Sequence, residues 1–146
     1  MTRKTLRKGT VVSIAAVLCS LALVGCTGEE KIALKPTAAL PKAEGTVTAW
    51  KDNLDDIVVD IEAKHLVPPI EMMDHIHYTA WAKDGNTVSR LGTLKLEGGS
   101  VGRLVAKTQM KHFKVSVTID DGPSPDKPKP FPILKSVAPI RAGQLS

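Results

Sequence analysis

The chain has 146 residues, enough for one domain, and contains 20 Lys and Arg against 15 Asp and Glu. Four of the positive charges lie within the first eight residues, so from Cys26 onward the two signs nearly balance, at 16 against 15. The charges alternate in sign there and aromatic residues are few, which argues against the basic surface that nucleic-acid binding requires. No nucleic-acid partner is therefore expected.

The N-terminus has the pattern of a secretory signal. Residues 1–9 hold the four basic residues and no acid, and residues 10–25 are apolar with small residues toward the end. This apolar run is shorter than the roughly 20 residues that a membrane-spanning helix needs. It ends in Leu23-Val24-Gly25-Cys26, which resembles a lipobox, the signal for lipidation and cleavage of bacterial prolipoproteins. An uncleaved anchor and an ordinary signal peptide are the alternatives.

The lipobox resemblance implies a location and a mode of attachment. Residues 1–25 would be a lipoprotein signal peptide, removed together with Cys19, and Cys26 would become an N-terminus acylated with chains such as palmitate. Two or more acyl chains give stable attachment to a membrane. The protein would then lie in a bacterial cell envelope, outside the cytoplasm. Thr27 favours the outer membrane, facing the periplasm, if the organism is Gram-negative.

The segment after the lipobox predicts a flexible tether over 26–45. Its sequence over 27–44, TGEEKIALKPTAALPKAE, is polar, contains Pro and Ala, and lacks a sustained hydrophobic period. A flexible coil of this length reaches roughly 25 Å on average. A short helix over 29–34 is the competing interpretation. At the other end of the chain, residues 139–146 are expected to be loose.

Residues 46–138 have the pattern of a β-sandwich domain. Apolar and polar residues alternate over 56–64 and 113–120, so each segment is expected to form a strand with one face toward a core and one toward water. Such one-sided strands are typical of antiparallel sheets. Further strands are expected at 46–51, 76–83, 88–96 and 101–107, with an edge strand over 131–137.

The connections between these segments predict the architecture. Asp84-Gly85-Asn86 and Glu97-Gly98-Gly99-Ser100 supply residues that tolerate positive φ, which favours hairpins. Pro68-Pro69 excludes a central strand, and five prolines between 123 and 132 favour extended polyproline conformation. Short strands separated by such turns predict a mostly β fold, an Ig-like antiparallel β-sandwich of six or seven strands.

The order of these segments also resembles a known domain. A strand and a Pro-Pro connector precede Tyr78-Thr79-Ala80-Trp81-Ala82, an Asp-Gly turn, Leu91-Gly92-Thr93-Leu94 and Phe113-Lys114-Val115-Ser116-Val117-Thr118. This order over 47–120 resembles the extracytoplasmic C-terminal domain of RskA-type anti-sigma factors. The chain has no sigma-binding helices or zinc-binding His/Cys motif, so the resemblance implies a fold and does not carry over sigma-factor inhibition.

A cluster of histidines and methionines is the candidate metal site. It consists of His65, Met72, Met73, His75 and His77. Imidazole suits copper or zinc and thioether suits Cu(I), and His75 and His77 share one face of a strand because they are two residues apart. The alternative is that the methionines cover the core while the histidines face water.

Other candidate groups have simpler explanations. Asp120, Asp121 and Asp126 lack the spacing of a calcium loop. Asp55, Asp56, Asp60 and Glu62 could suggest paired acids for general acid–base catalysis, but Asp60 and Glu62 alternate outward as on a solvated strand face. Trp50 and Trp81 could line a carbohydrate or peptide surface, although one buried tryptophan in each sheet is the commoner arrangement. No nucleophile elbow, P-loop or dinucleotide fingerprint is present.

These observations favour a non-enzymatic, lipid-anchored structural or protein-interaction module. It would have no cofactor, and its partner would be another envelope protein. A periplasm-facing copper or zinc binder is the alternative, and a hydrolase whose site forms only in the fold is a third.

Overall fold

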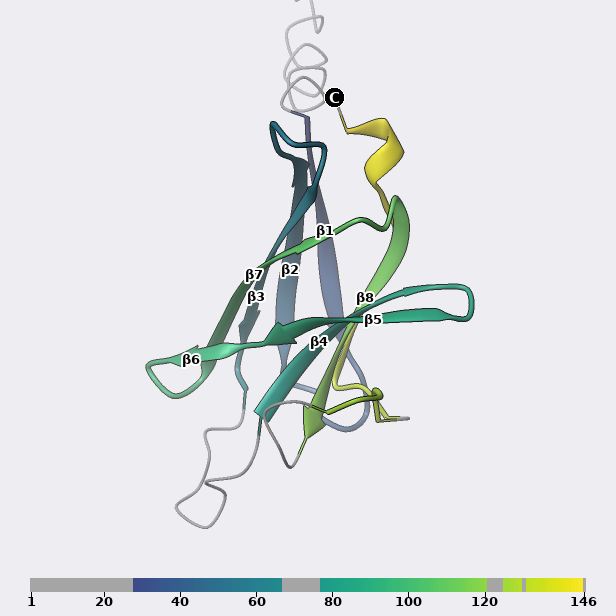
Figure 1. The fold of residues 1–146 in the computed structure, drawn as a ribbon. Helices are drawn as coiled ribbons and strands as arrows, with labels where there is room; N and C mark the ends of the chain where they lie inside the picture. The colour runs from purple at the N-terminus through teal and green to yellow at the C-terminus, as the bar shows by residue number, and fades with distance from the viewer. Residues whose placement is uncertain (1–27, 67–76, 121–124, 130, 146) are drawn as a thin grey trace, which may run out of the picture.

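The computed structural model describes residues 28–66, 77–120, 125–129 and 131–145. These residues form ten strands of one sheet, in which every pair of neighbours is antiparallel (Figure 1). The strands are β1 (Glu29–Pro36), β2 (Glu44–Lys51), β3 (Ile57–Lys64), β4 (His77–Asp84), β5 (Thr87–Thr93), β6 (Lys95–Glu97), β7 (Val101–Thr108), β8 (His112–Asp120), β9 (Leu134–Ser136) and β10 (Ile140–Arg141). A short 3₁₀ helix, η3, covers Ala142–Gln144.

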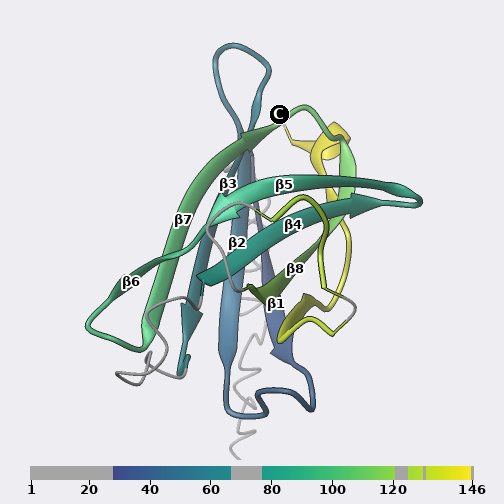
Figure 2. The ribbon, with the colours of Figure 1, turned by 60° about the horizontal axis from the view of Figure 1, so that its bottom comes forward.

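The sheet curls into a nearly closed barrel. Its neighbours follow the order β5-β4-β8-β9-β1-β2-β3-β7-β6, with β10 beside β8. The two ends of this order meet because β5 and β6 follow each other around Leu94, and β5 pairs with β4 while β6 pairs with β7. Figure 2 shows β5 leading into β6 across one side of the molecule. The curl leaves one face of each strand inside.

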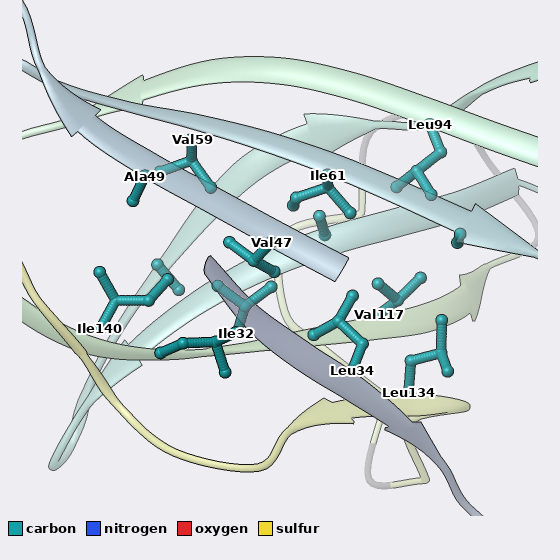
Figure 3. Packing of buried hydrophobic residues seen from close by; sticks show 14 of the residues in the cluster. Ile32, Leu34, Val47, Ala49, Val59, Ile61, Leu94, Val117, Leu134 and Ile140 are labelled. Atoms are coloured by element: carbon teal, nitrogen blue, oxygen red, sulfur yellow. The ribbon is translucent and has the colours of Figure 1, made fainter. Parts of the chain in front are cut away.

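The interior is filled by the apolar residues of the alternating strands. On β3, Ile57, Val59, Ile61 and Ala63 are buried, as the period of two predicts. Figure 3 shows side chains from β1, β2, β3, β8, β9 and β10 meeting in this core. Its members include Ile32, Leu34, Val47, Ala49, Val59, Ile61, Leu94, Val117, Leu134 and Ile140.

The mostly β class, the antiparallel pairing and both hairpins are confirmed. Gly85 lies in the β4–β5 turn with φ 56°, and Gly98 and Gly99 lie in the β6–β7 turn with φ 61° and 83°. The expected sandwich of six or seven strands is wrong in its strand count and layering. The chain forms ten strands of one curled sheet, and residues 88–96, predicted as one strand, divide between β5 and β6.

The predicted tether over 26–45 is wrong for most of its length, as is the competing helix. Residues 29–36 form β1, which pairs with β2 on one side and β9 on the other. Ile32 and Leu34 are buried in the core while Lys31, Ala33 and Lys35 are exposed. Only Ile32 and Leu34 of β1 are buried, too few for a clear period in the sequence, and pairing with β2 and β9 adds ladder hydrogen bonds on both sides.

The C-terminus, expected to be loose over 139–146, is also attached. Ile140 pairs with Phe113 of β8 and is fully buried, and Leu145 is buried as well. The Arg141 N–H donates to Glu30 Oε2 at 2.9 Å, and the Ala142 N–H donates to the Lys111 carbonyl at 2.7 Å. Both ends of the described chain therefore lie at the same end of the barrel (Figure 1).

The expected edge strand over 131–137 is a central one. Only Leu134–Ser136 is extended as β9, and it pairs with both β1 and β8. The proline-rich residues before it shorten the strand because proline cannot donate to a ladder. In the part of the chain with described structure, no helix is long and apolar enough to cross a membrane.

Candidate binding site

A pocket lined with lysines lies on the outer face of the barrel. It is formed by β4, β8, β9 and the residues that precede β9, and its volume is about 430 Å³. Its polar lining consists of Lys83, Lys114, Lys129, Lys135, Ser116 and Ser136. Pro128, Pro132 and Val115 supply the remaining wall, and no carboxylate of the described residues lines it. We call this site the lysine pocket.

Strand register brings the lysines together. Lys83 on β4 lies directly opposite Lys114 on β8, and Ser116 lies opposite Lys135 on β9. Like charges at directly opposite positions of an antiparallel pair are unfavourable. The ion pairs within the described residues do not involve Lys83, Lys114 or Lys135. The described part of the chain therefore supplies no ion-pair partner to these three lysines.

Backbone contacts hold the wall beside β9 in place. The Ile133 N–H donates to the Val117 carbonyl at 2.8 Å, and the Thr37 hydroxyl donates to the Pro132 carbonyl at 2.6 Å. The Val115 N–H donates to Ser136 Oγ at 3.0 Å. These bonds fix residues 132–136 against β8 and Thr37, so the β9 side of the pocket is part of the folded framework.

A second outer-face feature is a buried polar chain next to the lysine pocket. The Trp81 Nε1–H donates to Thr118 Oγ1 at 2.9 Å, and the Thr118 hydroxyl donates to Asp120 Oδ2 at 2.8 Å. Asp120 is only 1% exposed, and its other oxygen, Oδ1, has no hydrogen-bond partner among the described residues. Thr79 lies opposite Thr118, and its Oγ1 is likewise buried without a hydrogen-bond partner among the described residues. Trp81 is therefore a buried structural residue.

Trp50 belongs to a small apolar strip on the outer face of the barrel, over β2, β3 and β7. Trp50 on β2 lies opposite Val58 on β3, and Val105 on β7 lies opposite Asp60, two residues along from Val58. Val58 is 6% exposed although it points away from the core, whereas Val105 is 64% exposed. We call Trp50, Val58 and Val105 the outer strip. It is the second surface that offers contact to a partner.

The predicted metal ligands are only partly placed. Met72, Met73 and His75 lie outside the described residues. His65 follows β3 with φ 56°, and its Nε2 lies 3.5 Å from Glu44 Oε1. His77 begins β4 and lies opposite Asp120 in register. The described residues contain no group of three or more His, Cys, Asp or Glu that could hold a metal ion.

Cys26 and the predicted signal peptide, residues 1–25, also lie outside the described part of the chain. Of the three acids that lack the spacing of a calcium loop, Asp121 lies outside it, Asp120 is buried and Asp126 is exposed. Lipidation of Cys26 therefore stays a prediction.

The acids of β3 and its preceding turn mostly form surface ion pairs. Asp55 lies 3.0 Å from Lys51, and Glu62 lies 2.5 Å from Arg103 and 3.2 Å from Lys64. Hydrogen bonding to Lys64, supported by the charge of Arg103, lowers the pKa of Glu62. These partners hold Glu62 in its charged form, which is unsuited to a general acid near neutral pH.

The turn before β3 contains a further acid that the sequence did not single out. Asp52 Oδ2 accepts a hydrogen bond from Lys107 Nζ at 2.7 Å, and its Oδ1 accepts from the N–H groups of Leu54 and Asp56. These bonds, that from Lys107 above all, lower the pKa of Asp52, and Asp52 in turn raises the pKa of Lys107. The pair joins the β2–β3 turn to β7.

Sequence analysis missed the lysine pocket. Lys83, Lys114 and Lys135 are far apart in the chain, and each alternates outward on its strand like an ordinary solvated residue. Only the pairing of β4 with β8 and of β8 with β9 brings them together.

Comparison with known proteins does not assign the chain to a family. No family model, curated protein or solved structure matches it.

Proposed function

We propose that this protein is a lipid-anchored component of a bacterial cell envelope that acts as a non-enzymatic structural or interaction module. The lipobox-like Leu23-Val24-Gly25-Cys26 supports the anchor. The resemblance of residues 47–120 to RskA-type extracytoplasmic domains supports a location outside the cytoplasm. The observation that carries the proposal is the start of β1 at Glu29, because only Thr27 and Gly28 separate it from Cys26.

This short separation gives the module a fixed position. A lipid on Cys26 would hold the barrel directly at the membrane, with the start of β1, the β2–β3 turn and the C-terminus toward the bilayer (Figure 1). Leu54, in that turn, is 78% exposed. An exposed leucine at this end suits contact with the lipid interface, where apolar side chains are favoured.

The outer strip is the surface that best suits a protein partner. Its exposed Val105 lies on β7, on the side wall of the barrel, next to the Asp52–Lys107 and Glu62–Arg103 pairs. Apolar residues surrounded by paired charges resemble the core and rim of a small protein interface. The partner would be another envelope protein that reaches this side wall.

Photo-crosslinking in cells tests the proposal. A photoreactive residue at Val105 is expected to give one recurrent crosslinked product, and the same residue at the exposed Ala39, in the β1–β2 connection, is expected to give none. The product should disappear in a Cys26→Ala variant, because that chain would no longer be anchored beside its partner. No recurrent product at Val105, or a product unaffected by Cys26→Ala, would count against an anchored interaction module.

A periplasm-facing copper or zinc binder is the second candidate. It is favoured by the register pairing of His77 with Asp120, whose Oδ1 is buried without a partner among the described residues. His75, Met72, Met73 and His65 would supply further ligands. Titration of the full chain in detergent with Cu(I), Cu(II) and Zn(II) is expected to show stoichiometric binding that His75→Ala/His77→Ala abolishes and His112→Ala preserves. Binding unaffected by the double variant would eliminate this candidate.

A further inference from the structure

We propose that the lysine pocket binds the phosphate group of a phosphate monoester, carried either by a soluble molecule or by a lipid headgroup. The inference uses only the described residues of β4, β8, β9 and the segment before β9. It goes beyond the proposed function and does not depend on a lipid at Cys26.

The charge of the pocket favours an anion. Elsewhere on the barrel, some directly opposite charged residues are complementary, as in Glu62 and Arg103 of β3 and β7, whose side chains lie 2.5 Å apart. Others carry like charge, as in Lys35 of β1 opposite Lys135 of β9. Lys83 of β4 and Lys114 of β8 are also directly opposite, and both carry a positive charge. An anion between them would change a repulsive pair into two attractive ones.

Asp84, a carboxylate near the pocket, does not form an ion pair with Lys83 or Lys114. Asp84 lies at the end of β4, and its Oδ1 is 3.7 Å from His112 Nδ1 in a neighbouring hollow that also touches Lys83 and Lys114. No ion pair joins Asp84 to either lysine. The place of a counter-ion beside Lys83 and Lys114 is therefore open to a ligand.

The hydrogen-bonding groups favour a phosphate over a carboxylate. Each lysine ammonium has three donors, and a phosphate oxygen shell accepts bonds from several directions. Ser136 Oγ already accepts the Val115 N–H, so its own hydroxyl hydrogen is available to donate into the pocket. Ser116 adds a second hydroxyl between Trp81 and Lys135 in register. Converging ammonium and hydroxyl donors match a tetrahedral dianion.

The size and walls of the pocket favour an ester over the bare ion. A volume of about 430 Å³ falls within the range of small-molecule sites and exceeds what one phosphate group fills. Pro128, Pro132 and Val115 provide apolar surface for the carbon part of the ligand. Because the Ile133 and Val115 N–H bonds fix the β9 side of the pocket on β8, little ordering of that side is needed on binding.

Calorimetric titration of the full chain in a non-ionic detergent at low salt tests the proposal. The probes are glycerol 3-phosphate, dioctanoyl phosphatidic acid and phosphate-free dioctanoylglycerol. At least one phosphate probe is expected to bind, and the phosphate-free probe is expected not to. A Lys83→Gln/Lys114→Gln/Lys135→Gln variant should weaken the affinity by about tenfold or more. Tighter binding of phosphatidic acid than of glycerol 3-phosphate would assign the site to a lipid headgroup, and equal binding would assign it to a soluble ester.

A matched variant separates a site from general charge. Lys31→Gln/Lys42→Gln/Lys95→Gln removes the same three charges from exposed positions outside the pocket, and its affinity should stay within about twofold of the wild type. Circular dichroism checks that both variants fold. The proposal is overturned if neither phosphate probe binds, if the pocket variant binds as well as the wild type, or if both variants lose affinity equally. A Cys26→Ala chain should bind glycerol 3-phosphate normally, so failure of the lipid-anchor proposal leaves this result intact.

Discussion

Trp81 and Thr118 are joined by a buried hydrogen bond of 2.9 Å on the face of the sheet that points away from the core. The Thr118 hydroxyl accepts a hydrogen bond from the indole and donates one to Asp120 Oδ2, so it is the hydrogen-bond partner of two buried side chains. A polar chain of this kind is stable only while its links are complete, because each unpaired buried group has a desolvation cost.

Replacing Thr118 with valine therefore has a clear expected result. Thr118→Val keeps the shape and strand preference but leaves the Trp81 N–H without an acceptor and Asp120 Oδ2 without its donor. Chemical denaturation should show a loss of about 1–3 kcal/mol in the free energy of unfolding. Thr48→Val, on the outer face of β2, is the control and should change it by less than about 0.5 kcal/mol. Equal effects of the two substitutions would show that the polar chain is not stabilising.

The placement of β1 in the core gives a second prediction. Leu34 is 2% exposed between β2 and β9, so Leu34→Ala should lower the free energy of unfolding by about 2–5 kcal/mol. The exposed Leu54→Ala is the matched control and should have almost no effect. A flexible segment at 26–45 would make the two substitutions equally mild, so thermal or denaturant unfolding distinguishes the strand from the tether.

The close approach of β2 to β3 gives a third prediction, which concerns two glycines. A Cβ at Gly45 would lie 2.6 Å from the backbone oxygen of Glu62, which cannot rotate away. A Cβ at Gly102 would meet Leu66 and Leu94 side-chain carbons at 2.9 Å, which can shift. Gly45→Ala should therefore lower the free energy of unfolding by about 1–3 kcal/mol relative to the wild type. Gly102→Ala should lower it by less. The reverse order in a denaturant titration would contradict this register.

The Asp52–Lys107 pair gives a pH dependence. The pKa of Asp52 is lowered in the folded protein from its ordinary 3.8, so the pair stabilises the fold above that value, and the stabilisation is lost as the pH falls through the lower, folded value. The melting temperature of the wild-type protein, measured from pH 6 to pH 2, should fall toward the acid end of this range. Asp52→Asn should make that fall shallower. An identical profile for the two proteins would mean that Asp52 does not contribute to the acid dependence.

A strand could be predicted from the sequence where one of its faces is apolar and the other is polar. Residues 57–64 and 113–120 have this pattern, and both form strands as predicted. β1 escaped prediction because only Ile32 and Leu34 face the core, and the last residues escaped because β10 has two residues. Local pattern cannot show that a segment is held by neighbours on both sides.

The arrangement of the strands as one curled sheet and the position of the lysine pocket depend on pairing between strands that are distant in the sequence. Neither could be predicted from local alternation. Alternation is the same in a sandwich and in a curled sheet, and closure here depends on the bend at Leu94 between β5 and β6. The lysine pocket likewise needs the register that places Lys83 opposite Lys114. Single lysines at alternate positions carry no sign of that pairing.

The central claim, an envelope lipoprotein whose barrel begins directly after its lipid, is tested most directly by mass spectrometry of the N-terminus. The full chain would be produced in a bacterium, isolated from membranes and digested with trypsin. We expect an N-terminal peptide of Cys26–Lys31 whose cysteine sulfur carries a diacylglyceryl group. An unmodified peptide covering Gly9–Lys31, intact across the Gly25–Cys26 bond, would contradict the claim.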